Sequence, residues 1–353
     1  MRELRMKVLF LYTELVDYFL KCCEELSQNA EVHIIRWEVN KEAPFQFEHS
    51  AKIKIYDKAN YNFEQLKNLV VEINACIIFC SGWVDKDYLK LTKSYFKKIP
   101  TVMSCDTHWR GDIKQCLAVI LSRIFLLRTF SAAWVPGKAQ FRYVKKMGFK
   151  KIKTGFYCCD LKKFNTVYEK TKPEKEKKFP KRFLYVGRYY DFKGVGDLWQ
   201  AFIELQIEMP NDWELWCLGA GSLAPVQHEK IKHFGFVQPK DLEPIMEKSG
   251  VFVLPSRFEP WAVVVQEYAA AGFPMILSNA VGAKEVFLQK GKNGFSFQTH
   301  NILELKTQLK NIIKLNDKEL NLMSQHSHGL AQQNSPEKWA ASVVEFYKEF
   351  NAK

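Results

Sequence analysis

Short apolar runs alternate with longer amphipathic stretches along most of the 353-residue chain. The runs have the length and composition of buried strands, and the stretches between them have helical periodicity. In the first half, the predicted strands are Val8–Tyr12, Val32–Arg36, Ala75–Cys80, Thr101–Cys105 and Ala132–Val135. The predicted helices are Glu14–Ser27, Phe63–Glu72, Asp85–Lys98, Ile113–Leu127 and Lys138–Met147. Strands that alternate with helices indicate a parallel sheet with crossover helices, which is an α/β fold.

A polar segment at residues 168–181 interrupts this alternation, which then starts again. The segment carries two prolines and many charges, and this predicts a linker. The predicted strands after it are Phe183–Val186, Glu214–Leu218, Phe234–Val237, Val251–Leu254, Met275–Ser278 and Gly294–Phe297. We therefore predict two doubly wound domains, at residues 1–167 and 182–335, followed by an amphipathic helix at 336–353. Ligands of such sheets bind at the carboxyl ends of strands, so a cleft between the facing domains is the expected site.

The net charge of +13 is concentrated in one stretch of the chain. Residues 90–153 contain fifteen Lys or Arg and two acids, so this stretch carries the whole excess. Such a stretch suits a polyanion or an anionic membrane surface, although a solvated basic face without a partner has the same composition. Residues 114–128 mix Ile, Leu and Phe with Arg, as expected either for an interfacial helix or for a core helix with a basic outer face. No nucleic-acid-binding motif accompanies the charge, so nucleic acid is not an expected partner.

Composition and cysteine usage point to a cytosolic globular protein. The chain is 47% hydrophobic and 26% charged, which excludes disordered and collagen-like classes. The most apolar long stretch, Cys116 to Trp134, is interrupted by Arg123 and Arg128 and does not suit a membrane span. The nine cysteines are scattered and form no CxxC pair, as is typical of thiols in a reducing compartment. The basic stretch makes peripheral contact with the inner face of the plasma membrane a further expectation.

A first candidate motif runs from Val186 to Gly194 and carries two cations, Arg188 and Lys193. It follows a predicted strand and precedes a predicted helix, where free backbone N–H groups and the helix dipole favour an anion. The guanidinium of Arg188 can form a forked contact with a phosphate, and Lys193 adds a point charge. Together the two cations suit a diphosphate. Surface cations in a βα loop are the alternative interpretation.

A second candidate motif follows the apolar strand Val251–Leu254 and contains two carboxylates, Glu259 and Glu267. Ser256 and Glu259 have capping-box spacing, but Pro260 argues against that box and is better suited to the first helical position. Glu259 is then expected in the loop at the strand end. Glu267 is expected about two turns into an apolar helix, where a carboxylate needs a partner. Sugar hydroxyls suit both carboxylates, and a buried ion pair is the alternative for Glu267.

Three weaker signals lie at the ends of predicted strands or directly after them. Gly219 begins a Gly-Ala-Gly segment that allows a ligand to approach the backbone closely. Phe236 and Val237 end a predicted strand and suit a base pocket. His108 and Asp106 follow a strand of the first domain and are candidates for contact with substrate. A full GxGxxG motif is absent, which argues against a dinucleotide oxidoreductase.

Between Phe183 and Phe297 the order and spacing of these motifs resemble the retaining GT-B glycosyltransferases of family 4. The resemblance rests on the segments VGRYYDFKGVGDLWQAF, LGAGS, FGFV, VFVLPSRFEPWAVVVQEYAAAGFPMILSNAVGAKEVF and NGFSF. Glu259 and Glu267 match the family's pair of glutamates, and Arg188 and Lys193 match its phosphate-binding cations. The resemblance implies two Rossmann-like domains facing across a cleft, with the last helix returning to the first domain.

The resemblance also implies roles for the residues of the second domain. This domain would hold a nucleotide-diphosphate sugar, with Arg188 and Lys193 stabilising the leaving diphosphate. Glu259 would contact the hydroxyls of the sugar, and Glu267 those of the ribose. Phe236 and Val237 would lie beside the base, and Trp261, Ala262 and Val263 would contribute backbone N–H groups. Gly187 and Gly219 would complete the donor contacts.

In the first domain His108 would lie near the reacting sugar, although Asp106 competes for that position. Two features depart from the family pattern. Ala262 stands where most members have glycine, and Tyr12–Val16 replaces the usual Gly-Gly loop after the first strand. The acceptor side of the site is therefore not defined by motifs.

The activity implied by the resemblance is transfer of a hexose from a UDP- or GDP-sugar to a glycan or lipid-linked acceptor, with retention of configuration. Such transfer depends on preorganised cations at the leaving diphosphate. In the family these cations take the place of a divalent metal, so neither a metal nor another cofactor is expected. A role in surface polysaccharide or glycolipid biosynthesis is the corresponding expectation. Three alternatives remain: a nucleotide-sugar epimerase, an inactive scaffold of the same fold, and a non-enzymatic nucleic-acid binder.

Overall fold

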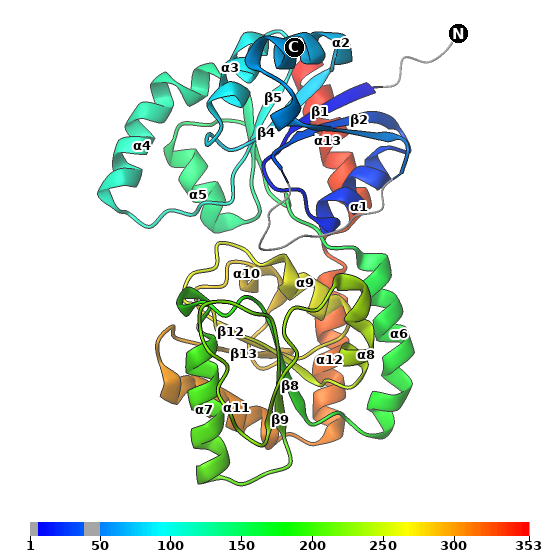
Figure 1. The fold of residues 1–353 in the computed structure, drawn as a ribbon, viewed down its shortest axis with the longest axis vertical. Helices are drawn as coiled ribbons and strands as arrows, with labels where there is room; N and C mark the ends of the chain where they lie inside the picture. The colour runs from blue at the N-terminus through cyan, green and yellow to red at the C-terminus, as the bar shows by residue number, and fades with distance from the viewer. Residues whose placement is uncertain (1–5, 39–49, 353) are drawn as a thin grey trace. The chain divides into compact units, whose positions relative to one another are not determined.

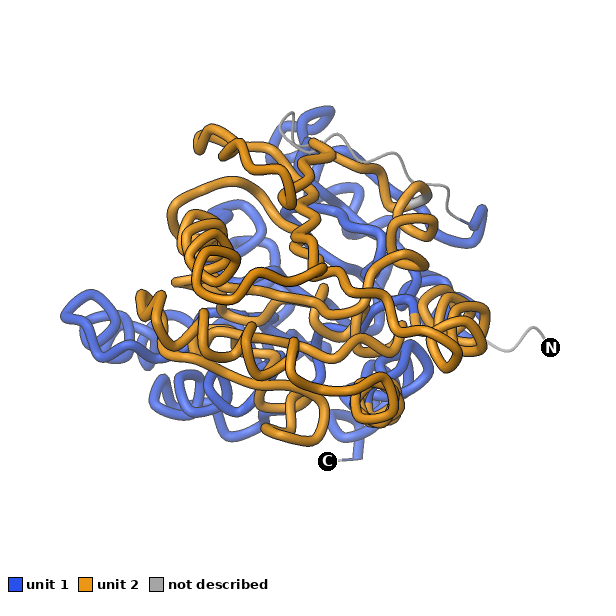
Figure 2. Tube along the Cα trace, turned by 90° about the horizontal axis from the view of Figure 1, so that it is seen from below, with its two compact units in different colours: residues 1–160, 334–353 blue, residues 161–333 orange. Residues whose placement is uncertain are grey.

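The computed structural model describes residues 6–38 and 50–352 of the chain. These residues form two compact units. The first unit contains residues 1–160 and 334–353, and the second contains residues 161–333 (Figure 2). Each unit has its own parallel sheet with helices on both faces (Figure 1).

The first unit is built on a seven-stranded parallel sheet with the order β3-β2-β1-β4-β5-β6-β7. Its strands are β1 (Met6–Leu11), β2 (Ala30–Arg36), β3 (Ile53–Asp57), β4 (Ile77–Ser81), β5 (Thr101–Ser104), β6 (Ala132–Trp134) and β7 (Ile152–Lys153). Its helices are α1 (Asp17–Leu26), α2 (Phe63–Ile73), α3 (Lys86–Tyr95), α4 (Ile113–Ile124), α5 (Lys138–Lys146) and α13 (Pro336–Asn351). The sequence does not predict the edge strands β3 and β7, which lie outside its strongest apolar runs.

Helices cover both faces of this sheet, which explains why its inner strands β1, β4 and β6 are apolar at nearly every position. In β1, Val8 and Phe10 join the core on one face, together with α1 and α13. Leu9 and Leu11 join the core on the other face, together with α2, α3 and α5. Burial on both sides removes the period-two pattern that a strand with one solvated face shows.

The last helix, α13, belongs to the first unit although it follows the whole second unit in the sequence. Its Trp339, Val343 and Phe346 are buried in the same core as Phe10 and Trp134. The indole N–H of Trp339 donates a hydrogen bond to the carbonyl oxygen of Phe156 at 2.7 Å. In Figure 1 the helix, coloured red, lies beside α1.

The second unit is built on a six-stranded parallel sheet with the order β10-β9-β8-β11-β12-β13. Its strands are β8 (Arg182–Val186), β9 (Glu214–Leu218), β10 (Ile231–His233), β11 (Val251–Leu254), β12 (Met275–Ser278) and β13 (Gly294–Phe297). Its helices are α6 (Leu161–Lys177), α7 (Val195–Glu208), α8 (Glu243–Glu247), α9 (Val263–Ala270), α10 (Lys284–Phe287), α11 (Ile302–Ile313) and α12 (Asp317–Ala331). Helix α7 packs against α11, and α12 packs against α9 and α6.

The structure differs from the sequence prediction at residues 168–181. Most of this predicted linker lies in helix α6, which begins at Leu161 and belongs to the second unit. Its buried positions, which include Leu161, Phe164, Tyr168 and Thr171, are spaced three or four residues apart and form one face. The charged residues between them occupy the solvent side and hide this periodicity. The first unit accordingly ends at residue 160 rather than 167, and the second runs from 161 to 333.

Among the described residues, no helix combines the length and the apolar content needed to cross a lipid bilayer.

Candidate functional site

The two candidate motifs of the second unit lie at the point where its strand order reverses. Strands β8 and β11 are neighbours in the middle of the sheet, and the chain builds outward from them in opposite directions. The loop after β8 spans residues 187–194, and the loop after β11 spans residues 255–262. Both loops leave the carboxyl ends of their strands, and this switch point is where open α/β sheets bind ligands.

Lys193 and Glu259 meet at this switch point although they lie 66 residues apart in the sequence. The Nζ of Lys193 donates to Oε2 of Glu259 at 2.5 Å, and both side chains are largely buried, with 17% and 14% exposed. The hydroxyl of Ser256 donates to the same oxygen at 3.3 Å. The Ser256–Glu259 contact is thus not a helix cap, because Glu259 lies in the loop before α9, as its motif predicts.

A second ion-pair network, which the sequence interpretation misses, holds the same two loops together. The guanidinium of Arg257 contacts both carboxylate oxygens of Asp197, at 3.1 and 2.7 Å, and also reaches Asp191 at 2.5 Å. The hydrogen bond to Asp197 is the main reason why the pKa of Arg257 is raised above its usual value. The backbone N–H of Arg257 donates to the carbonyl oxygen of Phe192 at 2.8 Å. Arg257 lies inside the second motif, whereas Asp191 lies inside the first and Asp197 follows it in α7, so only the topology reveals these contacts.

Two glycines allow the loops at this edge of the sheet to approach each other closely. Gly194 has φ +67°, and a Cβ there would lie 2.1 Å from the carbonyl oxygen of Pro255. Gly219 has φ +140°, and a Cβ there would lie 1.9 Å from the carbonyl oxygen of Gly187. Neither position accepts a side chain without a shift of the backbone. The predicted site residues Gly187 and Gly219 therefore lie in direct contact with each other.

Helix α9 begins at Val263, three residues later than the placement of Pro260 at the first helical position predicts. The loop before it is pinned to the segment after β12. The N–H of Gly282 donates to the carbonyl oxygen of Glu259 at 3.0 Å, and the N–H of Ala283 donates to that of Trp261 at 2.9 Å. These contacts hold residues 259–261 beside the segment that contains Val281, and the helix therefore starts after the buried Trp261.

The residue that precedes α9, Ala262, has a left-handed backbone conformation with φ +80° and ψ +89°. An L-residue with a Cβ is strained there, whereas glycine is not. This explains physically why glycine suits this position of the motif. Ala262 provides no side-chain cap. Among the described contacts, the first backbone N–H of α9 that donates within the helix is that of Val265, which donates to the carbonyl oxygen of Ala262 at 3.2 Å. The N–H groups of Ala262, Val263 and Val264 therefore form an uncapped helix N-terminus, which favours an anion.

Glu267 lies four residues after Val263, on the same face of α9. The side chains of Glu267 and Val263 are both half-buried, whereas Trp261 is buried. The Glu267 charge adds to the effect of burial and raises the pKa of the neighbouring Tyr268 hydroxyl well above its usual value.

Arg188 is exposed, and its guanidinium lies 5.5 Å from the centroid of the Tyr190 ring, within cation–π distance. Its carbonyl oxygen accepts a hydrogen bond from the Tyr185 hydroxyl at 2.9 Å, which fixes the backbone of the loop. Arg188 thus extends outward from a fixed loop, whereas Lys193 is held inward by Glu259.

Phe236 and Val237 lie in a loop rather than in the predicted strand, because β10 ends at His233. Gly235 has φ +68° and turns the chain at this point. Its carbonyl oxygen accepts a hydrogen bond from the N–H of Gly219 at 2.7 Å, which ties this loop to the end of β9. The Phe236 side chain is 48% exposed, and Val237 is half-buried. Aromatic rings at such strand ends are suited to stacking on flat ligand groups.

The candidate residues of the first unit, His108 and Asp106, follow strand β5. The carboxylate of Asp106 accepts a hydrogen bond from the Tyr157 hydroxyl at 3.2 Å. His108 is half-buried, and burial is the main reason why its pKa is lowered, with the Arg110 charge adding to the effect. A lowered pKa keeps the imidazole neutral near pH 7. After β1, the Tyr12–Val16 segment contacts the end of β4, where the hydroxyls of Thr13 and Ser81 lie 3.4 Å apart.

Within residues 6–38 and 50–352, no three or more His, Cys, Asp or Glu side chains are grouped in a way that would hold a metal ion.

Residues 180–314 match the protein family described as glycosyl transferases group 1. The spore coat protein SA of Bacillus subtilis is 34% identical over 127 residues, which cover 32% of this chain and 33% of that protein. The chain therefore matches about a third of the length of this curated relative. The match supports a glycosyltransferase and does not favour the epimerase alternative.

Solved structures resemble the whole chain at low sequence identity. Sucrose-phosphate synthase from Thermosynechococcus elongatus has a TM-score of 0.73 at 16% identity, and the likeness covers 99% of this chain and 100% of that one. A trehalose-6-phosphate structure from E. coli, bound with UDP-2-fluoro glucose, has a TM-score of 0.73 at 11% identity and covers 97% and 99%. The predicted fold class, two Rossmann-like parallel α/β domains of the GT-B type, is thereby confirmed.

Proposed function

We propose that this protein is a retaining, metal-independent GT-B glycosyltransferase of family 4. In this proposal it transfers a hexose from a UDP- or GDP-sugar to a glycan or lipid-linked acceptor during surface polysaccharide or glycolipid synthesis. The donor is held by the second unit. The match of residues 180–314 to glycosyl transferases group 1 supports the activity, and the UDP-2-fluoro glucose of the E. coli structure supports the class of donor.

The observation that carries the proposal is the Lys193–Glu259 pair beside the uncapped start of α9. A lysine at 2.5 Å from a carboxylate and a row of free N–H groups converge on one strand-end switch point. A diphosphate needs several donors and a cation, and a sugar ring needs carboxylate acceptors for its hydroxyls. Lys193 offers the cation that the diphosphate needs, and Glu259 offers the carboxylate that the sugar hydroxyls need.

Each residue has a defined part in the proposed transfer. Negative charge grows on the leaving diphosphate as its bond to the sugar breaks. Lys193, Arg188 and the N–H groups of the α9 terminus stabilise that charge, and they do so more strongly in the transition state than in the ground state. Glu259 accepts hydrogen bonds from the sugar hydroxyls and Glu267 from the ribose. Phe236, with Val237 beside it, stacks on the base.

The first unit provides the acceptor side in this proposal. His108 approaches the reacting sugar as a neutral imidazole, with Asp106 as the alternative group at that position. Retention of configuration follows from attack on the same face from which the diphosphate departs. The cations of the second unit supply the charge stabilisation that a divalent metal supplies in other transferases.

The first test is a thermal-shift panel of UDP, GDP, ADP and their common sugars, with and without a divalent metal. A ligand of the folded state stabilises it by RT ln(1 + [L]/Kd), about 2.7 kcal/mol at a hundredfold excess over Kd. We expect a shift with one nucleotide that needs no metal and is lost in Glu267→Ala. Glu304→Ala is the matched control, because this carboxylate is half-buried like that of Glu267 but lies in α11, outside the two motif loops. Its shift should equal that of the wild type.

Product analysis then tests the reaction itself. Incubation with the nucleotide sugar that binds, plus glycan or lipid-linked acceptors, should release nucleoside diphosphate and form a glycoside of the donor's anomeric configuration. Absence of a shift with every nucleotide would refute the proposed donor site. An inverted product would refute the assignment to a retaining mechanism.

A further inference from the structure

Helix α4 of the first unit presents apolar side chains to solvent. Six apolar side chains of the helix and its C-cap are each at least half exposed, namely Ile113, Leu117, Ile120, Leu121, Ile124 and Phe125. They recur at a spacing of three or four residues and therefore form one continuous face. A contiguous apolar face of this kind is unusual on a soluble protein and indicates a contact surface.

The two buried side chains of α4 are polar, whereas an ordinary surface helix buries apolar ones, and Val119 on the same side is partly buried against the core. Gln115 is 5% exposed, and its side chain accepts from the N–H of Arg110 at 2.6 Å and donates to the carbonyl oxygen of His108 at 2.8 Å. Ser122 is 2% exposed, and its hydroxyl donates to the carbonyl oxygen of Met147 at 3.0 Å. Because these buried polar groups have specific backbone partners, they fix which side of the helix faces the unit.

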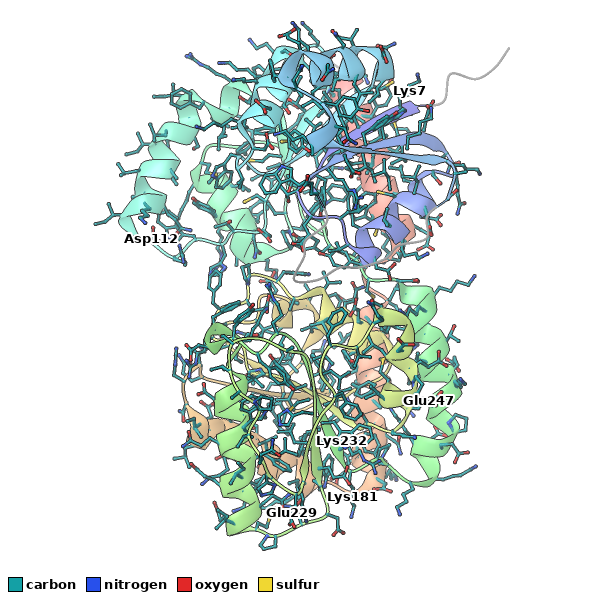
Figure 3. The ribbon with its side chains drawn as sticks, in the orientation of Figure 1. Lys7, Asp112, Lys181, Glu229, Lys232 and Glu247 are labelled. Carbon is teal, nitrogen blue, oxygen red and sulfur yellow. The ribbon has the colours of Figure 1, made fainter. Side chains whose placement is uncertain are left out.

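Cations flank the exposed apolar face on both sides. At about 100° per residue, Arg123 lies at one margin of the face, and Lys114 lies near the other margin, between Leu121 and Phe125. Both cations are exposed, as are Arg128 at the end of the segment and Lys145 and Lys146 on α5. Figure 1 shows α5 beside α4, and the contact of Ser122 with the residue after α5 agrees with it. Asp112, labelled in Figure 3 at the start of α4, is the helix N-cap and pairs with Arg110.

We propose that α4 is a membrane-docking helix that lies in the interface of an anionic lipid bilayer. Its apolar face enters the boundary between headgroups and acyl chains, and Lys114 and Arg123 extend toward lipid phosphates. Residues 90–153, which include α4, hold the entire positive excess of the chain, as an anionic leaflet requires. Docking of this kind would bring the proposed acceptor side to lipid-linked substrates. It involves a different unit from the donor site and is measured without a sugar donor.

The same charge argues against a second copy of the chain as the occupant of this face. Two copies that met through α4 would bring two basic regions together at short range, with few acids to offset them. Like charges at such an interface oppose association. Anionic lipid supplies both the apolar medium and the complementary charge.

The test is co-sedimentation of the full chain with vesicles of phosphatidylcholine alone and of phosphatidylcholine with 30% phosphatidylglycerol. We expect binding to the anionic vesicles at low salt and weaker binding to the neutral ones. Ile120→Glu should lower the partition coefficient at least about tenfold, because burial of one isoleucine side chain is worth that much. Ile207→Glu is the matched control, since Ile207 is 76% exposed on α7 of the second unit. It should leave vesicle binding unchanged.

Two further measurements separate the outcomes. Lys114→Gln combined with Arg123→Gln should weaken binding and reduce its dependence on salt, while thermal unfolding stays that of the wild type because both positions are exposed. Sedimentation velocity without lipid should give a monomer. A dimer that Ile120→Glu converts to a monomer would overturn the proposal in favour of self-association. Equal binding of wild type and Ile120→Glu, or no binding to anionic vesicles at all, would also overturn it. Donor binding is expected to persist in Ile120→Glu, so failure here is distinguishable from failure of the proposed function.

Discussion

Replacing Lys193 and Glu259 singly and together separates a structural ion pair from a functional one. The two charges lie 2.5 Å apart with 17% and 14% of their side chains exposed. Removing one partner of a buried pair leaves the other charge uncompensated and costs about 3–5 kcal/mol. Because each side chain keeps some contact with solvent, we expect about 3 kcal/mol for Lys193→Met and for Glu259→Gln, at the lower end of that range.

The double variant Lys193→Met/Glu259→Gln should recover most of this loss. It leaves no uncompensated charge, and replacing both partners of a buried pair is often close to neutral. We expect its free energy of unfolding to lie within about 1 kcal/mol of the wild type, measured by urea unfolding and analysed as a double-mutant cycle. The exposed pair Lys310–Glu208 is the control. Its side chains are 32% and 46% exposed, so its double variant should change stability by less than about 1 kcal/mol.

Turnover should follow the opposite pattern. If Lys193 stabilises the leaving diphosphate, then the stable double variant should still lose about 10²–10³ in rate, the typical effect of removing one preorganised donor. Arg188→Ala should lose as much without a large change in stability, because Arg188 is exposed. Turnover that returns together with stability in the double variant would refute the phosphate role of Lys193. Single variants as stable as the wild type would refute the argument from burial.

Two further predictions concern the backbone and a buried charge of the second unit. Ala262→Gly should stabilise the protein by about 0.5–1 kcal/mol in thermal unfolding, since relief of left-handed strain exceeds the added entropy of the unfolded chain. The control Ala269→Gly, within the same helix, should destabilise the protein. A loss of stability in both variants would contradict the strain at Ala262. Lys175 is 3% exposed with its Nζ 4.1 Å from the Phe273 ring centroid, and burial lowers its pKa to about 7. Between pH 7 and about 10.5 the unfolded chain therefore holds a proton that the folded chain has lost, so stability rises with pH over this window. The Lys175→Met variant should lose this rise of stability with pH and should be more stable than the wild type at pH 7 by about 2–4 kcal/mol. If urea unfolding shows the same dependence of stability on pH in the variant and the wild type, the role of Lys175 is contradicted.

The convergence of Lys193 and Glu259 is a consequence of topology that the sequence already indicates. Both residues follow strongly apolar runs, and the carboxyl ends of parallel strands meet at one edge of a sheet. The pattern of apolar and polar positions does not determine the order of the strands in the sheet. β8 and β11 are neighbours only because the chain builds the sheet outward from them in opposite directions. The Arg257–Asp197 contact depends on that same adjacency, and no spacing within either motif signals it.

Local physical effects explain where the sequence prediction is wrong or incomplete. The prediction of a linker over α6 relied on composition, and the charges on its solvent side outweigh a sparse apolar face. In α4 an apolar stripe at helical spacing fits a core face and an interfacial face equally well. The partners of Gln115 and Ser122 show that the apolar stripe faces solvent rather than the core, and these partners are backbone carbonyls that no side-chain pattern reveals. The start of α9 depends on the backbone bonds of Gly282 and Ala283, which come from the next strand's loop.

The contacts that position the candidate donor site do not involve the groups assigned to chemistry. Arg257 joins the two loops through Asp197 and Asp191, and the close approach of Gly194 to the Pro255 carbonyl fixes their separation. The segment after β12 holds the backbone of Glu259 independently of its carboxylate. A site built in this way keeps its geometry when Lys193 or Glu259 changes, which is the condition for electrostatic preorganisation. It follows that a loss of turnover in the stable double variant would report the missing charges themselves, because the scaffold that aims them remains in place.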